Sequence, residues 1–198
     1  MEIYLLDRNK DMTDAWHRAF DNHCCSENIH IINDTLINFL INYNIDGIVS
    51  PANSFGIMDG GYDKAIIDIF GEELQQKVRE TLKREVGGYQ TPGTCITVPF
   101  NENLTLFHTP TMRYPEEIAD GRIVFDCMYN TIKTARLSKC KAIVIPAFGG
   151  CTGALDFDVI ARYMCMGWEY DKFYDIKSNW DMVNHTRYQF YKAEEKHK

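Results

Sequence analysis

Two polar side chains, Asn53 and Asp63, lie ten positions apart on either side of the glycine pair Gly60-Gly61. An asparagine amide both donates and accepts hydrogen bonds, and a carboxylate can hold a hydroxyl group or polarise a water molecule. The glycines between them allow positive φ angles and bring backbone N–H groups close to a ligand. This combination of residues suits an anionic ligand that also carries hydroxyl groups.

The elements around this loop have the order that a phosphate site needs. The run Ile45 to Ser50 is expected to be a strand, and a helix is expected to begin near Tyr62, so its positive dipole end points at the loop. The same order returns at Lys141 to Ile145, where a glycine-rich loop leads into a helix from about Asp156, whose side chain can cap it. Because ligands bind beyond the carboxyl ends of strands in open α/β sheets, we expect both loops to line one crevice.

The remaining pattern predicts an α/β fold. Before the first loop we expect strands at 2–6 and 29–32 and helices at 11–22 and 36–43, the last one short and largely buried. This alternation predicts right-handed crossovers and a largely parallel sheet. After the loop we expect helices at 63–70, 72–85 and 122–137, a hairpin-like strand pair at 94–98 and 104–108, and a packed helix in the tail with a frayed end at about 190–198.

A proline-rich segment, 108–115, is too irregular for a helix or a strand and is expected to be a loop at a strand end. Arg113 lies in this loop. Two roles are open for its guanidinium group, a phosphate contact or a structural hydrogen bond to loop carbonyls.

Composition narrows the class of protein. The 198 residues, 45% of them hydrophobic and without a linker-like stretch, predict one domain over 1–198. The net charge of −7 argues against non-specific nucleic-acid binding, whereas a small anion can still be held by backbone amides. No signal peptide or membrane-spanning run is apparent, so a cytoplasmic protein without membrane contact is expected.

Seven cysteines without a C-x-x-C pair suit reduced, mostly buried thiols. The group His23-Cys24-Cys25 with His30 matches no zinc motif, so no metal site is expected.

Three segments at predicted strand ends, taken together, resemble the macro domain family, which binds ADP-ribose. The resemblance covers about Ile29 to Trp168. The family's Gly-Asp-Ile-Thr segment is matched by Asn33-Asp34-Thr35-Leu36. Its Asn-Ala-Ala-Asn loop, with the glycines and the Ala-Ile helix that follow, is matched by Ser50-Pro51-Ala52-Asn53, Gly60-Gly61 and Ala65-Ile66. Its Pro-Ala and Ser-Thr-Gly loop is matched by Pro146-Ala147 and Gly149 to Gly153. The sequence looks most like the small stand-alone macro proteins of bacteria and phages.

This resemblance implies a three-layer α/β/α sandwich with a mixed, largely parallel central sheet, and a site without a cofactor. It implies that Asp34 accepts a hydrogen bond from the adenine amino group, that the glycine loops hold the diphosphate, and that Asn53 orients the distal ribose. The ADP-ribose-binding residues expected from it are Asp34, Thr35, Ala52, Asn53, Gly60, Gly61, Phe148, Gly149, Gly150, Cys151, Thr152, Gly153 and Ala154.

In the family branch that removes single ADP-ribose units from proteins, the functional Asn and Asp are also ten positions apart. The resemblance therefore implies that Asn53 and Asp63 are catalytic and that the chain is a mono-ADP-ribosyl hydrolase. Its partner would be ADP-ribose, a related NAD-derived nucleotide or an ADP-ribosylated macromolecule, and a monomer is expected.

Departures from the family pattern keep other functions open. Ser50 stands in place of the first loop Asn, Asp59 puts a carboxylate near the expected diphosphate, and Ala154 stands in place of an aromatic residue. A module that binds ADP-ribose without turnover and a phosphatase on an ADP-ribose phosphate ester are the alternatives. Individual residues also have plainer interpretations: Asp34 as the N-cap of the helix from Leu36, and Cys151 as a small loop residue rather than a nucleophile.

Overall fold

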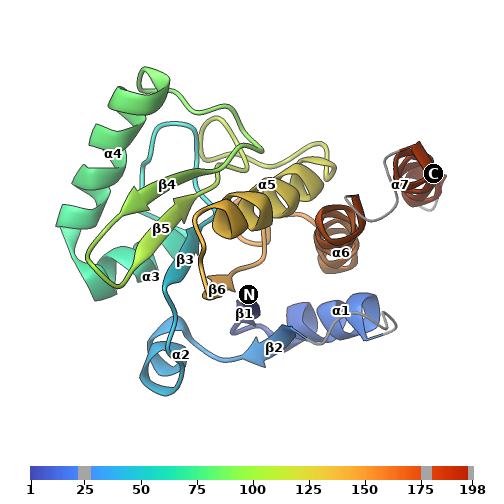
Figure 1. Ribbon diagram of the computed structural model, residues 1–198, viewed down its shortest axis with the longest axis horizontal. Helices are drawn as coiled ribbons and strands as arrows, with labels where there is room; N and C mark the ends of the chain where they lie inside the picture. The colour runs from blue at the N-terminus through green and yellow to red at the C-terminus, as the bar shows by residue number, and fades with distance from the viewer. Residues whose placement is uncertain (22–27, 175–179, 196–198) are drawn as a thin grey trace.

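A mixed six-stranded sheet with the strand order β2-β1-β6-β3-β5-β4 forms the centre of the protein (Figure 1). The computed structural model describes residues 1–21, 28–174 and 180–195. Every neighbouring strand pair is parallel except β4 with β5, which pair antiparallel as the hairpin expected from the sequence. The predicted mixed, largely parallel sheet is confirmed.

Strands and helices alternate through most of the chain. The strands are β1 (Glu2–Asp7), β2 (Ile29–Asn33), β3 (Gly47–Ser50), β4 (Ile96–Pro99), β5 (Thr105–His108) and β6 (Ala142–Ile145). The helices are α1 (Lys10–Phe20), α2 (Leu36–Asn42), α3 (Gly61–Phe70), α4 (Glu72–Val86), α5 (Ile123–Leu137), α6 (Phe157–Tyr174) and α7 (Trp180–Glu195). From β1 to the start of α6, the expected ends differ from these bounds by no more than two residues. Residue 22 of the expected first helix, the pair Cys24-Cys25 and the last residues of the expected frayed end lie outside the described residues.

Helices cover both faces of the sheet, which confirms the three-layer arrangement (Figure 1). One hydrophobic cluster joins one face to α1, α5 and α6, and a second joins the other face to α2, α3 and α4. Adjacent residues of β3 show the two sides, because Val49 belongs to the first cluster and Ile48 to the second. Helix α7 packs on α6 rather than on the sheet.

Helix α2 is less buried than the sequence suggested. Leu36 and Phe39 are buried, but Ile37 and Ile41 are 57% and 76% exposed. The expectation of a largely buried helix is therefore wrong, because only the face carrying Leu36 and Phe39 packs against the sheet. Thr35, not Asp34, is the N-cap residue, since its side chain accepts the N–H of Asn38.

Asp46 connects the beginnings of two central strands, β3 and β6. Its carboxylate accepts the N–H groups of Lys141 and Ala142, at 2.9 and 2.8 Å, and the thiol of Cys140 at 3.1 Å. These bonds hold the register in which Gly47 lies opposite Ile143.

Replacing Asp46 by Ala should therefore lower the free energy of unfolding by about 1.5–3 kcal/mol, the usual contribution of a hydrogen bond to a charged group. Urea denaturation measures the loss. The control is Asp68→Ala, which removes only an exposed pair with Lys64 on α3 and should cost less than about 1 kcal/mol. Similar losses in the two variants would contradict the role given to Asp46.

Candidate functional site

A cavity of about 430 Å³ lies at the carboxyl ends of the parallel strands. Twelve of the residues expected to bind or act on a ligand line it: Asp34, Thr35, Ala52, Asn53, Gly60, Gly61, Asp63, Gly149, Gly150, Cys151, Thr152 and Gly153. They come from segments that follow β2, β3 and β6. The parallel sheet therefore brings most of the predicted site together, because the carboxyl ends of its strands meet at one edge.

Two expected binding residues, Phe148 and Ala154, are not among the lining residues. Phe148 is fully buried in the hydrophobic cluster beneath α6, because its side chain points into the core after β6 ends. Ala154 is exposed with a positive φ of 52°, in a turn closed by a hydrogen bond from its N–H to the carbonyl of Cys151. Phe148 and Ala154 therefore do not line the cavity, and a binding role for either stays a prediction.

The N-terminus of α3 opens on the cavity without a side-chain cap. Its N-cap residue is Gly60, and Gly61 has a φ of +57°, which a glycine adopts without strain. Within the described part of the chain, the N–H groups of Gly61, Tyr62 and Asp63 have no hydrogen-bond acceptor. Three free N–H groups and the positive end of the helix dipole form an anion-binding position.

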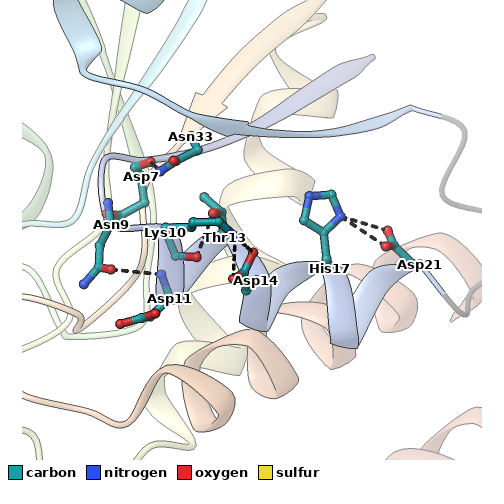
Figure 2. Close-up of polar contacts among 9 residues, drawn as sticks. All are labelled: Asp7, Asn9, Lys10, Asp11, Thr13, Asp14, His17, Asp21 and Asn33. Carbon is teal, nitrogen blue, oxygen red and sulfur yellow. Dashed lines mark hydrogen bonds and ion pairs between the residues drawn. The ribbon is translucent and has the colours of Figure 1, made fainter.

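Other helices that start at this edge are capped. Asn9 accepts the N–H of Asp11 at the start of α1, as Figure 2 shows, and Thr35 caps α2. Asp156 accepts the N–H groups of Asp158 and Val159, which confirms the cap predicted for α6. Among the helices bordering the cavity, α3 is therefore the one whose first turn has no side-chain cap within the described chain.

The two glycine loops meet across the cavity, as predicted. A Cβ atom added to Gly61 would lie 3.4 Å from the sulfur of Cys151. The second loop closes on itself, since Leu155 donates its N–H to the carbonyl of Gly149. It is also bonded to the segment before α5, because Ile118 donates its N–H to the carbonyl of Gly153. Cys151 is exposed in this loop and lies opposite the free end of α3.

The Asn53 side chain holds its own loop. Its Nδ2 donates to the carbonyl of Ile57 at 2.7 Å, and its Oδ1 accepts the N–H groups of Phe55 and Ile57 at 3.1 and 3.3 Å. One amide hydrogen remains for a ligand. The backbone of Asn53 also pairs with Met112, which brings the proline-rich loop to the cavity wall.

Asp63 is a buried carboxyl group in the first turn of α3, only 7% exposed. Its Oδ1 accepts a hydrogen bond of 2.7 Å from the Ser50 hydroxyl. Burial raises the pKa of Asp63 to about 7, the Ser50 hydrogen bond opposes this rise, and the Asp59 charge adds to it. Protonated and ionised forms therefore coexist near neutral pH, which is the range suited to a general base.

Asp34 lies at the end of β2, and its Oδ1 accepts the N–H of Thr35 and the amide of Asn38, at 2.7 and 2.9 Å. Its second oxygen has no partner among the described residues. β1 runs beside β2, with Asp7 opposite Asn33, and Figure 2 shows the Asn33 amide bonded to the carbonyl of Asp7.

The end of β1 adds residues that the sequence analysis did not single out. Asp7, Arg8 and Asn9 line the cavity next to Asp34. Among the described residues that line it, Arg8 has the one basic side chain, and it forms no hydrogen bond or ion pair with the described chain. The polar residues Asp7, Arg8 and Asn9 follow a predicted strand, and this pattern could have indicated a part of the site. Only the sheet order, however, places β1 between β2 and β6.

Tyr62 was also missed. Its ring lines the cavity, and its buried hydroxyl has no hydrogen-bond partner among the described residues. Burial, and then the charges of Asp7 and Asp63, raise the pKa of Tyr62, so the hydroxyl stays protonated and available as a donor.

The Arg113 guanidinium makes no hydrogen bond to a loop carbonyl of the described chain, and Arg113 is not among the residues that line the cavity. Its guanidinium lies over the Tyr89 ring and donates to the Tyr89 hydroxyl at 3.4 Å. His108, at the other end of the same loop, is fully buried beside Gln90, and burial lowers its pKa to about 3. It is therefore uncharged at neutral pH.

No helix within the described ranges is long and apolar enough to cross a membrane. The same residues contain no group of three or more His, Cys, Asp or Glu side chains that could hold a metal ion.

The macro domain family model matches residues 49–164, more than half of the chain. The chain therefore belongs to the macro domain family. An uncharacterized protein of Aquifex aeolicus (strain VF5) is 29% identical over 119 residues, which cover 60% of this chain and 70% of that protein.

Solved macrodomains share the fold. The macrodomain of Mycobacterium tuberculosis DarG matches with a TM-score of 0.56 and 16% identity, over 66% of this chain and 85% of that one. The Oceanobacillus iheyensis macrodomain with MES bound matches with a TM-score of 0.56 and 18% identity, over 66% and 72%. A mutant of the Oceanobacillus iheyensis macrodomain with ADPR matches with a TM-score of 0.50 and 16% identity, over 70% and 90%.

The burial of Asp63 predicts a pH-dependent difference between the wild type and Asp63→Asn. Between the unfolded pKa of about 3.8 and the folded pKa of about 7, the folded wild type binds more protons than the unfolded chain. The wild type therefore loses stability as the pH rises through this window, by about 1.4 kcal/mol for each pH step of one, whereas Asn does not titrate.

Urea denaturation at pH 4.5, 6 and 7.5 should show the free energy of unfolding of Asp63→Asn rising relative to that of the wild type. The buried His108 has the opposite pH dependence, but it is present in both proteins and cancels in the difference. A difference that stays constant with pH would show that Asp63 titrates normally.

Proposed function

We propose that the cavity binds ADP-ribose or an ADP-ribose derivative. The observation that carries the proposal is the uncapped N-terminus of α3, which opens on the cavity opposite the second glycine loop. A diphosphate fits this position because backbone N–H groups and the helix dipole favour an anion. Family membership supports the assignment, and a related macrodomain has been solved with ADPR.

The strand order suggests how the ligand lies. Adenine is assigned to the end of β2, where the free oxygen of Asp34 can accept its amino group and Thr35 forms the adjacent wall. The diphosphate is assigned to α3 and the β6 loop. The distal ribose is then assigned to the end of β3, beside Ala52, Asn53 and Asp63.

The negative charge of the cavity opposes the binding of this anionic ligand, and two features of the cavity reduce that repulsion. Four carboxyl groups line the cavity: Asp7, Asp34, Asp59 and Asp63. Burial raises the pKa of Asp63 to about 7, so part of its charge is neutralised near neutral pH, and burial also raises the pKa of Asp7. Arg8, which has no salt bridge to a described residue, is assigned to a ligand phosphate at the end of β1.

Calorimetry tests the ligand. ADP-ribose should bind, AMP should bind more weakly because it lacks the second phosphate and the distal ribose, and Asp34→Ala should weaken ADP-ribose binding roughly ten- to a hundredfold. Asp68→Ala, an exposed carboxylate away from the lining residues, is the control and should bind like the wild type. Absence of heat and of a thermal shift with millimolar ADP-ribose would reject the proposal.

We further propose that the protein hydrolyses an ADP-ribosyl linkage, with Asp63 as the general base. Water attacks the anomeric carbon of the distal ribose, its proton passes to the Asp63 carboxylate, and the bond to the acceptor oxygen breaks. The proton taken by Asp63 then passes, directly or through solvent, to the departing acceptor oxygen, which restores the carboxylate. The products are free ADP-ribose and the protonated acceptor, and the donors at α3 stabilise the charge on the phosphates. The burial of Asp63 and its pKa near 7 support this role.

Binding without turnover is the second candidate, and the Asn53 side chain is the observation that favours it. Its amide is mostly used inside the loop, with three hydrogen bonds to Phe55 and Ile57, so it has little capacity left to orient a ribose. In that case the cavity would sequester or sense the nucleotide.

Incubation with mono-ADP-ribosylated protein distinguishes these functions. A hydrolase releases free ADP-ribose, and Asp63→Ala should slow the release at least roughly a hundredfold, consistent with the usual contribution of general-base catalysis. Equal rates for wild type and Asp63→Ala would remove Asp63 from the mechanism. Substrate left intact by the wild type would favour a binding module, and phosphate release from an ADP-ribose phosphate ester would favour a phosphatase.

A further inference from the structure

Ser50 is the one residue whose hydroxyl reaches Asp63 within the described chain. Its side chain is fully buried at the carboxyl end of β3, and its Oγ lies 2.7 Å from Asp63 Oδ1. We infer that Ser50 is a positioning residue for Asp63: its hydroxyl holds one carboxylate oxygen and leaves the other for a water molecule or a ligand hydroxyl in the cavity. The inference rests on the proposed catalytic role of Asp63.

The backbone of Ser50 makes this hydroxyl a rigid donor. Ser50 lies opposite His108 in the β3–β5 pairing, and its carbonyl accepts the N–H of Thr109 at 3.0 Å. Ile48, two residues earlier on β3, belongs to the cluster under α3, and side chains two apart on a strand share a face. The strand therefore presents the Ser50 hydroxyl directly to the first turn of α3.

The surroundings of Asp63 give this one hydrogen bond a large influence. Asp59 is a like charge, and the nearby Tyr62 hydroxyl makes no hydrogen bond to the carboxylate or to any other described residue. His108, beside Ser50 in the sheet, is neutral at pH 7 because burial lowers its pKa. No described cation faces Asp63, so the Ser50 hydroxyl is the one side-chain contact within the described chain that favours the ionised form, in addition to the dipole at the start of α3.

The test compares Ser50→Ala with a matched variant, Ser54→Ala. Ser54 is also fully buried, in the loop that follows β3, but its hydroxyl donates to the carbonyl of Met112, at 3.4 Å, and interacts with Tyr89 rather than with Asp63. A carboxyl ¹³C NMR titration, with Asp63 identified by its loss in Asp63→Asn, reads the ionisation of Asp63 without any ligand.

Loss of a hydrogen bond to the ionised form should raise the midpoint of the Asp63 titration in Ser50→Ala by about one pH unit. The acidic limb of the pH–rate profile should move by the same amount, so that the rate falls roughly tenfold at pH 6 and recovers toward the wild-type rate at pH 9. Ser54→Ala should keep the wild-type midpoint, and Ser50→Thr, which retains the hydroxyl, should restore it.

An unchanged titration midpoint in Ser50→Ala would overturn the inference, and so would a rate loss of equal size at every pH. Should Ser50→Ala fail to fold, Ser50→Cys retains the side-chain size with a weaker donor, and its midpoint should also lie above that of the wild type. A wild type that releases no ADP-ribose would reject the proposed hydrolysis, while the NMR titration would still decide whether Ser50 controls Asp63.

Discussion

The unsatisfied N–H groups at the start of α3 are the constraint on which the site depends. A parallel sheet gathers the carboxyl ends of its strands at one edge, so the helices that follow also begin there and leave free donors. Asn9, Thr35 and Asp156 each accept one or two of these donors at α1, α2 and α6. At α3 the N-cap is Gly60, which has no side chain to do so, and the donors remain open to water or to an anion.

The acidic cavity sets a second requirement, because an anionic ligand has to approach several carboxyl groups. Burial reduces part of this repulsion by raising the pKa of Asp63 to about 7. The same burial that would help a diphosphate to bind also moves Asp63 into the pH range where it can exchange a proton. In the proposed function, the desolvation of Asp63 would therefore link binding and catalysis, and Ser50 counteracts this desolvation with a single hydrogen bond.

Loop architecture explains why the site holds its shape. Asn53 uses most of its hydrogen-bonding capacity inside the loop between β3 and α3, and its backbone pairs with Met112 of the proline-rich loop. The loop also packs on α4, since a Cβ atom at Gly56, which has a φ of +66°, would lie 2.8 Å from Val78. The ligand-facing backbone is thus positioned by contacts made outside the cavity, which lowers the entropy lost on binding.

The sequence by itself determined the elements, the glycine loops, the cap at Asp156 and twelve of the lining residues, because periodicity and turn residues act over a few neighbouring positions. Tertiary structure decided what depends on distant segments. The sheet order placed Arg8 beside Asp34, and packing turned Phe148 into the core and left one face of α2 exposed. Tertiary structure also decided the Ser50–Asp63 hydrogen bond and the pKa of Asp63, since burial is a property of the whole fold and no local pattern encodes it.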